Sequence, residues 1–404
     1  MTYNSKNESK SISNSDTDSN TDSNTDSDSE SNYIEWCGKI INSRYLIMNK
    51  IGKGSYCTVW NVYDIEEKKY LGFKIYNNDD TDDAKYEKKI MDDLKKLNIK
   101  DIVLYNKSFI YEYESNEYMI DILPIYGYSL NDIRHLLRDN LNLQDDNDCK
   151  IYNKYIEFLV KVMNILKNIL ENLHKNNYIH TDIKPENILI DKPRIDTLIL
   201  FEQIKNKHIE LKKKYKFKNL LSELSKYTLH IVENISIIES DIIKYIEDFN
   251  FSIKLCDMGT SLKANSTEIY KKHTSYYKSP MIILKYPLTN KYDYWSFACM
   301  MYELITFNVL FDPFNENLLE KYDDIEDFNL LYLIISTIGM PSSDIINNSS
   351  MKDIFFTFDK KTLRFYDKFI CNEFINNILF YKNNQNDNNI YTLLKFIIDN
   401  LTYE

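Results

Sequence analysis

The chain has 404 residues, 43% hydrophobic and 27% charged, a composition that can bury a large core and excludes a wholly disordered protein. Its formal net charge of −11 disfavours a protein whose whole surface binds nucleic acid or an anionic membrane. The six cysteines form neither a Cys-x-x-Cys pair nor a zinc-binding spacing, so we expect unpaired thiols in a reducing compartment. The polar N-terminus lacks a signal peptide's apolar core. We therefore expect a soluble intracellular protein, cytoplasmic or nuclear.

Residues 1 to about 32 consist mainly of Ser, Asn, Asp and Thr. So few large apolar side chains cannot offset the entropy lost on ordering, which predicts a disordered acidic tail. The tail either only keeps the protein soluble or offers its Ser-Asp and Thr-Asp steps to an acidophilic kinase.

The order of the predicted elements indicates an α+β protein with two lobes. From Tyr45 to about Met119 short β-type runs dominate, interrupted by one charged helix over about Asp82 to Leu97. After Gly127 the pattern is helical, and apolar residues recur at i, i+3 and i+4 between Tyr155 and Leu173. We expect a small β-rich lobe over about 45–126 and a larger, mainly helical lobe over about 127–404.

The first motif with chemical content is IGKGSYCTV, which lies between two strand-like runs. Gly52 and Gly54 would let backbone amides approach a triphosphate, and Val59 would pack on the nucleotide base. Because no helix follows, the motif resembles a flap over phosphates more than a dinucleotide-binding turn; the alternative is an ordinary tight turn. The candidate nucleotide-binding residues are Ile51, Gly52, Lys53, Gly54, Ser55, Tyr56, Cys57, Thr58 and Val59.

Lys74 lies among apolar residues of the next predicted strand, in LGFKIY. An unpaired buried ammonium group is costly, so it needs a counter-charge. Glu87 on the following helix is the best candidate, because Met91 lies one turn beyond on the same face and points to the interior. The alternative is a surface lysine on a half-exposed strand.

The segment YIHTDIKPENILI, from Tyr178 to Ile190, carries the strongest signal. Phosphoryl transfer needs a carboxylate that orients the attacking hydroxyl, a cation near the transferred group and an oxygen ligand for magnesium. Asp182, Lys184 and Asn187 supply these groups at spacings of two and three residues. Downstream, Asp257 closes an apolar strand and can bridge magnesium to phosphates, and Gly259 permits a sharp turn.

Together these motifs resemble the eukaryotic protein kinase family over about residues 45–404. HTDIKPEN is similar to the SR-protein kinase branch of the CMGC group. Three features agree with that branch: Cys57 stands in place of a third glycine, an insertion occupies about residues 191–250, and LIISTIGMP resembles a CMGC segment. Lys184 and Thr274 are typical of serine/threonine kinases.

The resemblance implies a kinase that uses ATP and Mg²⁺ to phosphorylate Ser or Thr of protein substrates. Lys74, held by Glu87, would position the α/β-phosphates, and Asn187 and Asp257 would bind magnesium. Asp182 would accept the hydroxyl proton, and Lys184 would stabilise the transferred charge. Leu123 would be the gatekeeper, the Pro124 carbonyl and the Tyr126 amide would face the adenine, and His180 would be structural.

Two departures from the family pattern carry consequences. Thr181 replaces the arginine that in many kinases receives an activation-loop phosphate, so we expect activity that does not depend on activation-loop phosphorylation. Met281 replaces a buried glutamate, whose arginine partner is missing as well. Replacing both members of a buried ion pair by apolar groups can be neutral.

The remaining signals leave alternatives open. A lysine run between Lys205 and Lys218 is either an import or partner patch or a solvated helix face. Acidic residues after the DYWSFACMMYELI helix either form a docking groove for basic, Arg/Ser-rich substrates or only aid solubility; they are Asp323, Asp324, Glu326 and Asp327. We expect a monomer that binds neither nucleic acid nor membranes directly. The rival hypothesis is a pseudokinase, an inactive ATP-binding or interaction scaffold.

Overall fold

The computed structural model describes residues 36–54, 56–77, 81–142, 144–232, 246, 250–264, 273–287, 289–314, 325–357 and 388–403. Contacts divide the chain after Trp36, and the unit described here begins at Cys37. The predicted acidic tail, Ser55, Asp323 and Asp324 lie outside the described residues.

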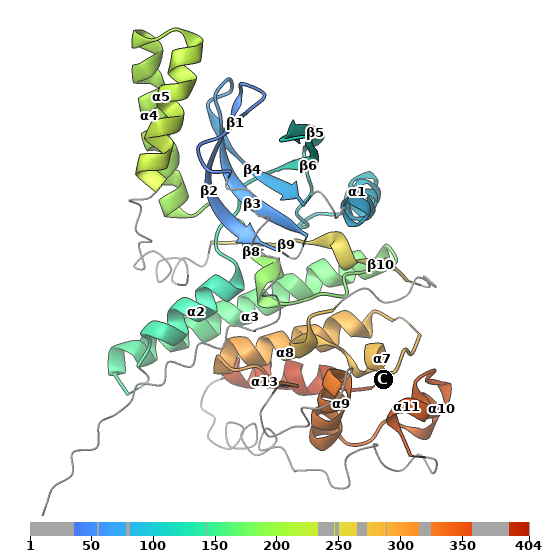
Figure 1. Ribbon diagram of the computed structural model, residues 1–404. Helices are drawn as coiled ribbons and strands as arrows, with labels where there is room; N and C mark the ends of the chain where they lie inside the picture. Colours follow the sequence, from blue (N-terminus) through green and yellow to red (C-terminus); the bar gives the residue numbers. More distant parts are fainter. Residues whose placement is uncertain are drawn as a thin grey trace, which may run out of the picture. The chain divides into compact units, whose positions relative to one another are not determined.

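A six-stranded antiparallel sheet forms the first part of this unit (Figure 1). Its strand order is β1-β2-β3-β4-β6-β5, and α1 (Thr81–Lys96) lies beside it. The β-branched and aromatic residues that predicted strands here do form them. The strands are β1 (Ile40–Ile41), β2 (Tyr45–Lys53), β3 (Cys57–Asp64), β4 (Lys69–Tyr76), β5 (Lys107–Tyr113) and β6 (Asn116–Leu123).

The second part is mainly helical, which confirms the predicted bilobal α+β architecture. Ser129 begins α2 with a reciprocal capping box to Asp132, and the apolar stripe predicted between Tyr155 and Leu173 is the buried face of α3. No helix of the described residues is long and apolar enough to cross a bilayer. The helices are α2 (Leu130–Asn140), α3 (Asp146–Lys175), α7 (Pro280–Ile283), α8 (Lys291–Thr306), α9 (Ile325–Ile338), α10 (Ser343–Asn348), α11 (Lys352–Phe355) and α13 (Asn388–Asn400).

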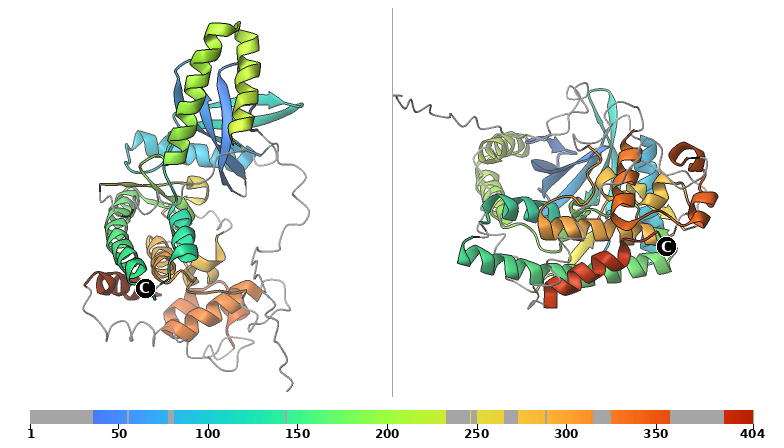
Figure 2. Two further views of the ribbon diagram at one scale, coloured as in Figure 1. Left: turned by 90° about the vertical axis from the view of Figure 1, so that its left-hand side faces the viewer. Right: turned by 90° about the horizontal axis from the view of Figure 1, so that it is seen from below.

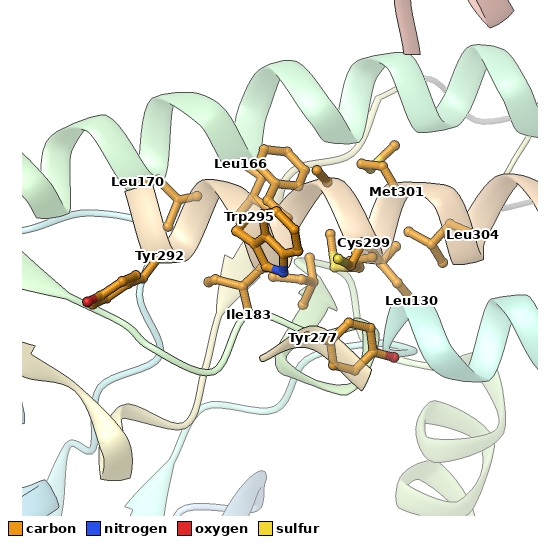
Figure 3. Packing of buried hydrophobic residues seen from close by; sticks show 14 of the residues in the cluster. Leu130, Leu166, Leu170, Ile183, Tyr277, Tyr292, Trp295, Cys299, Met301 and Leu304 are labelled. Carbon is orange, nitrogen blue, oxygen red and sulfur yellow. The ribbon is translucent and has the colours of Figure 1, made fainter. Parts of the chain in front are cut away.

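The core of the helical part lies around α8, which is buried on nearly every side. Figure 3 shows Trp295 of α8 close to Leu166 of α3, with Ile183 from the loop after β7 packed nearby. Ile183 is completely buried, although it lies between Asp182 and Lys184. The hydrophobic core therefore anchors the segment that carries the predicted catalytic residues.

Two short antiparallel pairs lie at the predicted site. The strand β7 (Tyr178–Ile179) pairs with β10 (Leu262–Lys263), and β8 (Ile188–Ile190) pairs with β9 (Ile253–Leu255). The loop 180–187 and the turn 256–261 are therefore held side by side, although some 70 residues separate them. Single 3₁₀ turns occur at Pro185–Asn187, Met258–Thr260 and Ser275–Tyr277.

The described part of the insertion is a helical hairpin, α4 (Ile195–Lys214) and α5 (Phe217–Val232). By sequence it belongs to the larger lobe, but it packs on the sheet of the smaller one (Figures 1 and 2). Ile204 and Leu224 are fully buried against Leu46 and Met48 of β2. The hydroxyl of Tyr63 on β3 hydrogen-bonds His208 Nδ1 at 2.9 Å in the same interface. The α4–α5 hairpin is therefore part of the smaller lobe's core.

We expect Ile204→Ala to lower the free energy of unfolding by about 2–4 kcal/mol, because it removes buried methyl groups and leaves a cavity. The matched control is Ile209→Ala on the same helix, where the side chain is 40% exposed and we expect a change of about 0.5 kcal/mol or less. Urea denaturation followed by circular dichroism measures both. Equal losses in the two variants would contradict the described packing.

Candidate active site

The predicted pair of Lys74 and Glu87 is in contact. Lys74 Nζ lies 2.6 Å from both carboxylate oxygens of Glu87, and 3.5 Å from Asp257 Oδ1. Lys74 and Glu87 are both buried, so each supplies the counter-charge that the other needs. Strand β4, helix α1 and the turn after β9 thereby bring one ammonium and two carboxylate groups together.

The charges of this group shift one another's pKa values. Burial alone would lower the pKa of Lys74, but the Glu87 carboxylate raises it well above its usual value. Desolvation would raise the pKa of Asp257, but the ammonium groups of Lys74 and Lys184 lower it. The Asp257 side chain has 47% of its surface exposed. This carboxylate is therefore charged at neutral pH and accessible to a ligand.

The second cluster surrounds Asp182 on the loop after β7. Its Oδ2 lies 2.7 Å from Lys184 Nζ, and its Oδ1 accepts a hydrogen bond from Thr274 Oγ1 at 2.9 Å. Lys184 Nζ also donates to Thr274 Oγ1 at 2.9 Å, and Asn187 Nδ2 donates to the Asp182 carbonyl at 2.8 Å. The carboxylate is thus held in one orientation beside a cation.

Backbone hydrogen bonds join the two clusters. The Cys256 amide donates to the Asn187 carbonyl at 2.9 Å, and the Cys256 carbonyl lies 3.0 Å from His180 Nε2. Asp257 directly follows this anchored residue and has a left-handed backbone with φ of 64°. Asp182, Lys184, Asn187 and Asp257 are therefore brought to one place in the structure.

The sequence analysis did not identify Asp293, a residue of α8 that accepts hydrogen bonds from the loop after β7. Its carboxylate is fully buried and accepts the amides of His180 at 2.9 Å and Thr181 at 2.8 Å. His174 Nε2 lies 2.7 Å from the same carboxylate. Burial would raise the pKa of Asp293, but these partners lower it. The available signal was an aspartate inside the otherwise apolar run of α8.

Thr181, at the position of the absent arginine, bonds the start of the activation segment. Its hydroxyl donates to the Thr260 carbonyl at 2.9 Å, and His273 Nδ1 lies 2.9 Å from the Thr181 carbonyl. Tyr86 of α1 donates to the Ser261 carbonyl at 2.8 Å. Neutral hydrogen bonds therefore hold this segment at residues 260–261 and again at His273.

The glycine-rich segment lies at the β2–β3 turn. The register of β2 against β3 slips twice before Gly52, and such bulges bend a strand. The Gly54 amide donates to the Cys57 carbonyl at 2.8 Å. Val59 pairs with Lys74 across β3 and β4, so the turn and the lysine belong to adjoining strands.

The predicted adenine-facing residues Pro124 and Tyr126 follow β6 directly. Gly127 fixes this connection: its amide donates to the Ile190 carbonyl at 2.8 Å, and a Cβ there would lie 2.2 Å from the Lys192 carbonyl oxygen. Only glycine allows so close an approach. The connection between the lobes therefore lies against the end of β8, next to the Asp182 loop.

The donor set fits magnesium bound together with a nucleotide. Asp257 and Asn187 offer the hard oxygen ligands that Mg²⁺ prefers. Within the described ranges, no three His, Cys, Asp or Glu side chains cluster closely enough to hold a metal ion alone. Phosphate and water oxygens would have to complete the coordination, as is usual for Mg²⁺ at phosphate-transfer sites.

The structure also shows the surroundings of the acidic segment and of Met281. Glu326 and Asp327 of the acidic segment face Lys278, whose Nζ lies 3.7 Å and 2.7 Å from them, and Ser275 also donates to Glu326. These two residues are thus engaged within the chain. Met281 is buried in the apolar core, and a buried ion pair not expected from the sequence, between Arg134 and Glu303 at 3.0 Å, lies elsewhere in the lobe.

Comparison with known proteins identifies the class. The model of the protein kinase domain family matches residues 45–385, and the chain belongs to this family. Its relatives are serine/threonine kinases of the CMGC type, consistent with the resemblance to the SR-protein kinase branch. Members of the family generally use ATP and Mg²⁺.

Three relatives show the breadth of the similarity. The chain is 27% identical over 341 residues to the serine/threonine-protein kinase SRPK of Physarum polycephalum, covering 79% of this chain and 72% of that protein. It is 23% identical to prp4 of Schizosaccharomyces pombe, covering 70% and 46% respectively. It is also 23% identical to the human dual specificity tyrosine-phosphorylation-regulated kinase 3, covering 77% and 40%. The chain thus spans less than half the length of the latter two.

We expect Asp293→Asn to destabilise the protein by about 3 kcal/mol at pH 7, because an amide cannot accept both backbone N–H groups and pair with His174. The folded-state pKa of Asp293 is lowered, so its stabilisation is present above its ordinary pKa and is lost as the pH falls through the folded value. Urea denaturation at pH 7 and at about pH 3, below the ordinary pKa of an aspartate, should therefore show a smaller difference from wild type at the lower pH. A difference that stays constant between the two would contradict this role.

Proposed function

We propose that this chain is a protein kinase that transfers the γ-phosphoryl group of ATP to serine or threonine hydroxyls of proteins. One observation carries the proposal: the Asp182 carboxylate is fixed by Lys184, Thr274 and Asn187, beside a turn whose charged Asp257 is accessible and contacts Lys74. Catalysis of this reaction depends on positioning and electrostatic stabilisation more than on covalent chemistry.

Each group has a role that its surroundings support. Asp182 would orient the attacking hydroxyl and accept its proton, and Lys184, 2.7 Å away, would stabilise charge on the transferred group. Lys74, paired with Glu87, would hold the α/β-phosphates. Asp257 and Asn187 would hold Mg²⁺, which neutralises phosphate charge when bound. The glycine-rich segment would cover the phosphates, and the backbone of Pro124 and Tyr126 would face the adenine.

The finer features of the proposal follow the sequence. The kinase domain would span about residues 45–404, with the insertion at 191–250, and would act as a cytoplasmic or nuclear monomer without direct nucleic-acid or membrane binding. Substrates rich in Arg and Ser remain a prediction. Because Glu326 and Asp327 already pair with Lys278, any acidic docking site would depend on other residues.

Asp182→Asn should reduce phosphoryl transfer by about 10²- to 10⁴-fold, because it removes the proton acceptor without changing the size of the side chain. Incorporation of label from [γ-³²P]ATP into a peptide array measures the loss. Binding of a fluorescent ATP analogue should persist in the same variant, since Asp182 does not hold the nucleotide. Equal incorporation by the variant and wild type would favour the pseudokinase alternative.

We also propose that activity does not require phosphorylation of the activation segment. A phosphate acts by pairing with an arginine, and Thr181 has no charge to offer. Its hydroxyl instead bonds the Thr260 carbonyl at 2.9 Å. In other kinases a phosphate orders the activation segment by pairing with the arginine. Here the neutral Thr181–Thr260 hydrogen bond would order this segment without any modification.

Two variants test this proposal. Replacing Ser266 and Thr267 by alanine and Tyr270 by phenylalanine together should change activity by less than about tenfold, because no arginine at position 181 could pair with their phosphates. Thr181→Val should lower activity by about fivefold, the effect of one neutral hydrogen bond. Thr181→Ser, which keeps the hydroxyl, is the matched control. A loss of more than about tenfold in the triple variant would contradict the proposal.

A further inference from the structure

Two buried polar residues beside the Lys74–Glu87 pair have no part in the mechanism described so far. Tyr76 lies two residues after Lys74 on β4, and Asp121 lies directly opposite Lys74 on β6. Side chains two apart on a strand, and cross-strand neighbours, share one face of a sheet. Lys74, Tyr76 and Asp121 therefore lie on the face that carries the contact to Glu87 of α1.

The Tyr76 hydroxyl joins the two acids. It lies 3.2 Å from Glu87 Oε2 and 3.1 Å from Asp121 Oδ2. Asp121 is completely shielded from solvent, and its other oxygen, Oδ1, finds no partner in the part of the chain that is described. A carboxylate in such a place keeps fewer hydrogen bonds than it makes in water, and this loss of hydration is costly.

Counting protons resolves this arrangement. One phenolic hydrogen makes only one linear hydrogen bond, so both contacts are favourable when one of the acids brings a proton of its own. Glu87 has Lys74 as a counter-ion at 2.6 Å, whereas Asp121 makes no ion pair in the described ranges. The proton therefore belongs on Asp121, which donates to the Tyr76 oxygen, while Tyr76 donates to Glu87.

The surroundings of Asp121 agree with a neutral acid. Burial raises the pKa of Asp121 above its usual value, against the smaller opposite effects of the hydrogen bonds from Ser108 and Tyr76 and of nearby lysines. Burial also raises the pKa of Tyr76. The titratable or charged groups that act on Asp121 come from β4, from α1 and from the segment before β5. They are Lys74, Tyr76, Glu87, Lys88, Lys95 and Tyr105, and Ser108 lies opposite on β5.

We propose that Tyr76 and Asp121 are positioning residues that hold the Glu87 carboxylate on Lys74 through a hydrogen-bond relay from Asp121 to Tyr76 to Glu87. The inference rests on the proposed function, since Lys74 then positions the phosphates of ATP. Without the relay Glu87 keeps its attraction to Lys74 but loses the donor that fixes Oε2. The ammonium then has more freedom, and the nucleotide is held less well.

The experiment compares Tyr76→Phe with wild type in steady-state kinetics and in binding of a fluorescent ATP analogue with Mg²⁺. Removal of one hydrogen bond to a charged group should raise the KM for ATP, and the Kd of the analogue, by about tenfold. The KM for the protein substrate should stay unchanged. Partial unfolding, in contrast, would lower kcat and leave both KM values unchanged.

Four further variants test the relay more closely. Tyr63→Phe, the matched control, removes an equally buried hydroxyl that bonds His208. Tyr63 lies four residues along β3 from Val59, the cross-strand partner of Lys74, so this variant should leave the KM for ATP unchanged. Asp121→Leu should reproduce Tyr76→Phe. Asp121→Asn keeps a donor for Tyr76 and should stay within about threefold of wild type. The double variant Tyr76→Phe/Asp121→Leu should be no worse than either single variant, because both break one relay.

The outcomes are separable. If wild type transfers no phosphoryl group, the proposed function fails, and analogue binding by the same variants still tests the relay. If wild type is active and Tyr76→Phe leaves the KM for ATP and the Kd of the analogue unchanged, the relay is wrong and the kinase stands. An Asp121→Asn variant as impaired as Asp121→Leu would also overturn the relay, because it would show that a neutral donor does not suffice.

Discussion

The buried carboxylate of Asp293 is the constraint on which the site depends. The loop between β7 and β8 has no regular structure of its own before Pro185, so something must accept its backbone amides. Asp293 accepts two of them, from His180 and Thr181, and the packed helix α8 holds Asp293 in turn. An unpaired polar group is costly in the buried interior. The Asp293 carboxylate therefore needs these backbone donors, and the donors need an acceptor. The position of Asp182 is therefore determined by the core.

Pairing of buried charge explains the rest of the site in the same way. Lys74 lies on strand β4 and Glu87 on helix α1. Their 2.6 Å contact fixes α1 against the sheet, and Tyr86 of the same helix bonds the Ser261 carbonyl. Asp257 is reached by cations from both sides, Lys74 from the sheet and Lys184 from the loop. Ion pairs and hydrogen bonds between buried or partly buried polar groups thus fix the positions of these elements at the site.

These facts also show what a sequence can predict. The alternation of β-type runs and the apolar stripe of α3 predicted the bilobal fold, because burial of one face imposes a period on the chain. Asp182, Lys184 and Asn187 were found because their chemistry is compressed into six residues. Asp293, Tyr76 and Asp121 were missed because their meaning depends on contacts across the fold: a single aspartate in an apolar run or a tyrosine on a strand has no local partner. The spacing of residues along the sequence predicts a site built from one short segment. A buried network of residues from several elements can be recognised only in the folded structure.

The insertion illustrates the same limit for packing. Its position in the sequence, between β8 and β9, suggests that it belongs to the larger lobe. Its lysine run gives no indication of an apolar face that packs on the sheet. The apolar face of α4 and α5 instead covers the sheet, where Leu46, Met48 and Tyr63 would otherwise be exposed. Both ends of the insertion adjoin the strands that carry Asn187 and Asp257 towards the site. A segment that begins and ends at the catalytic loops thus completes the core of the lobe that holds Lys74, and this links the stability of the sheet to the strands that hold the candidate metal ligands.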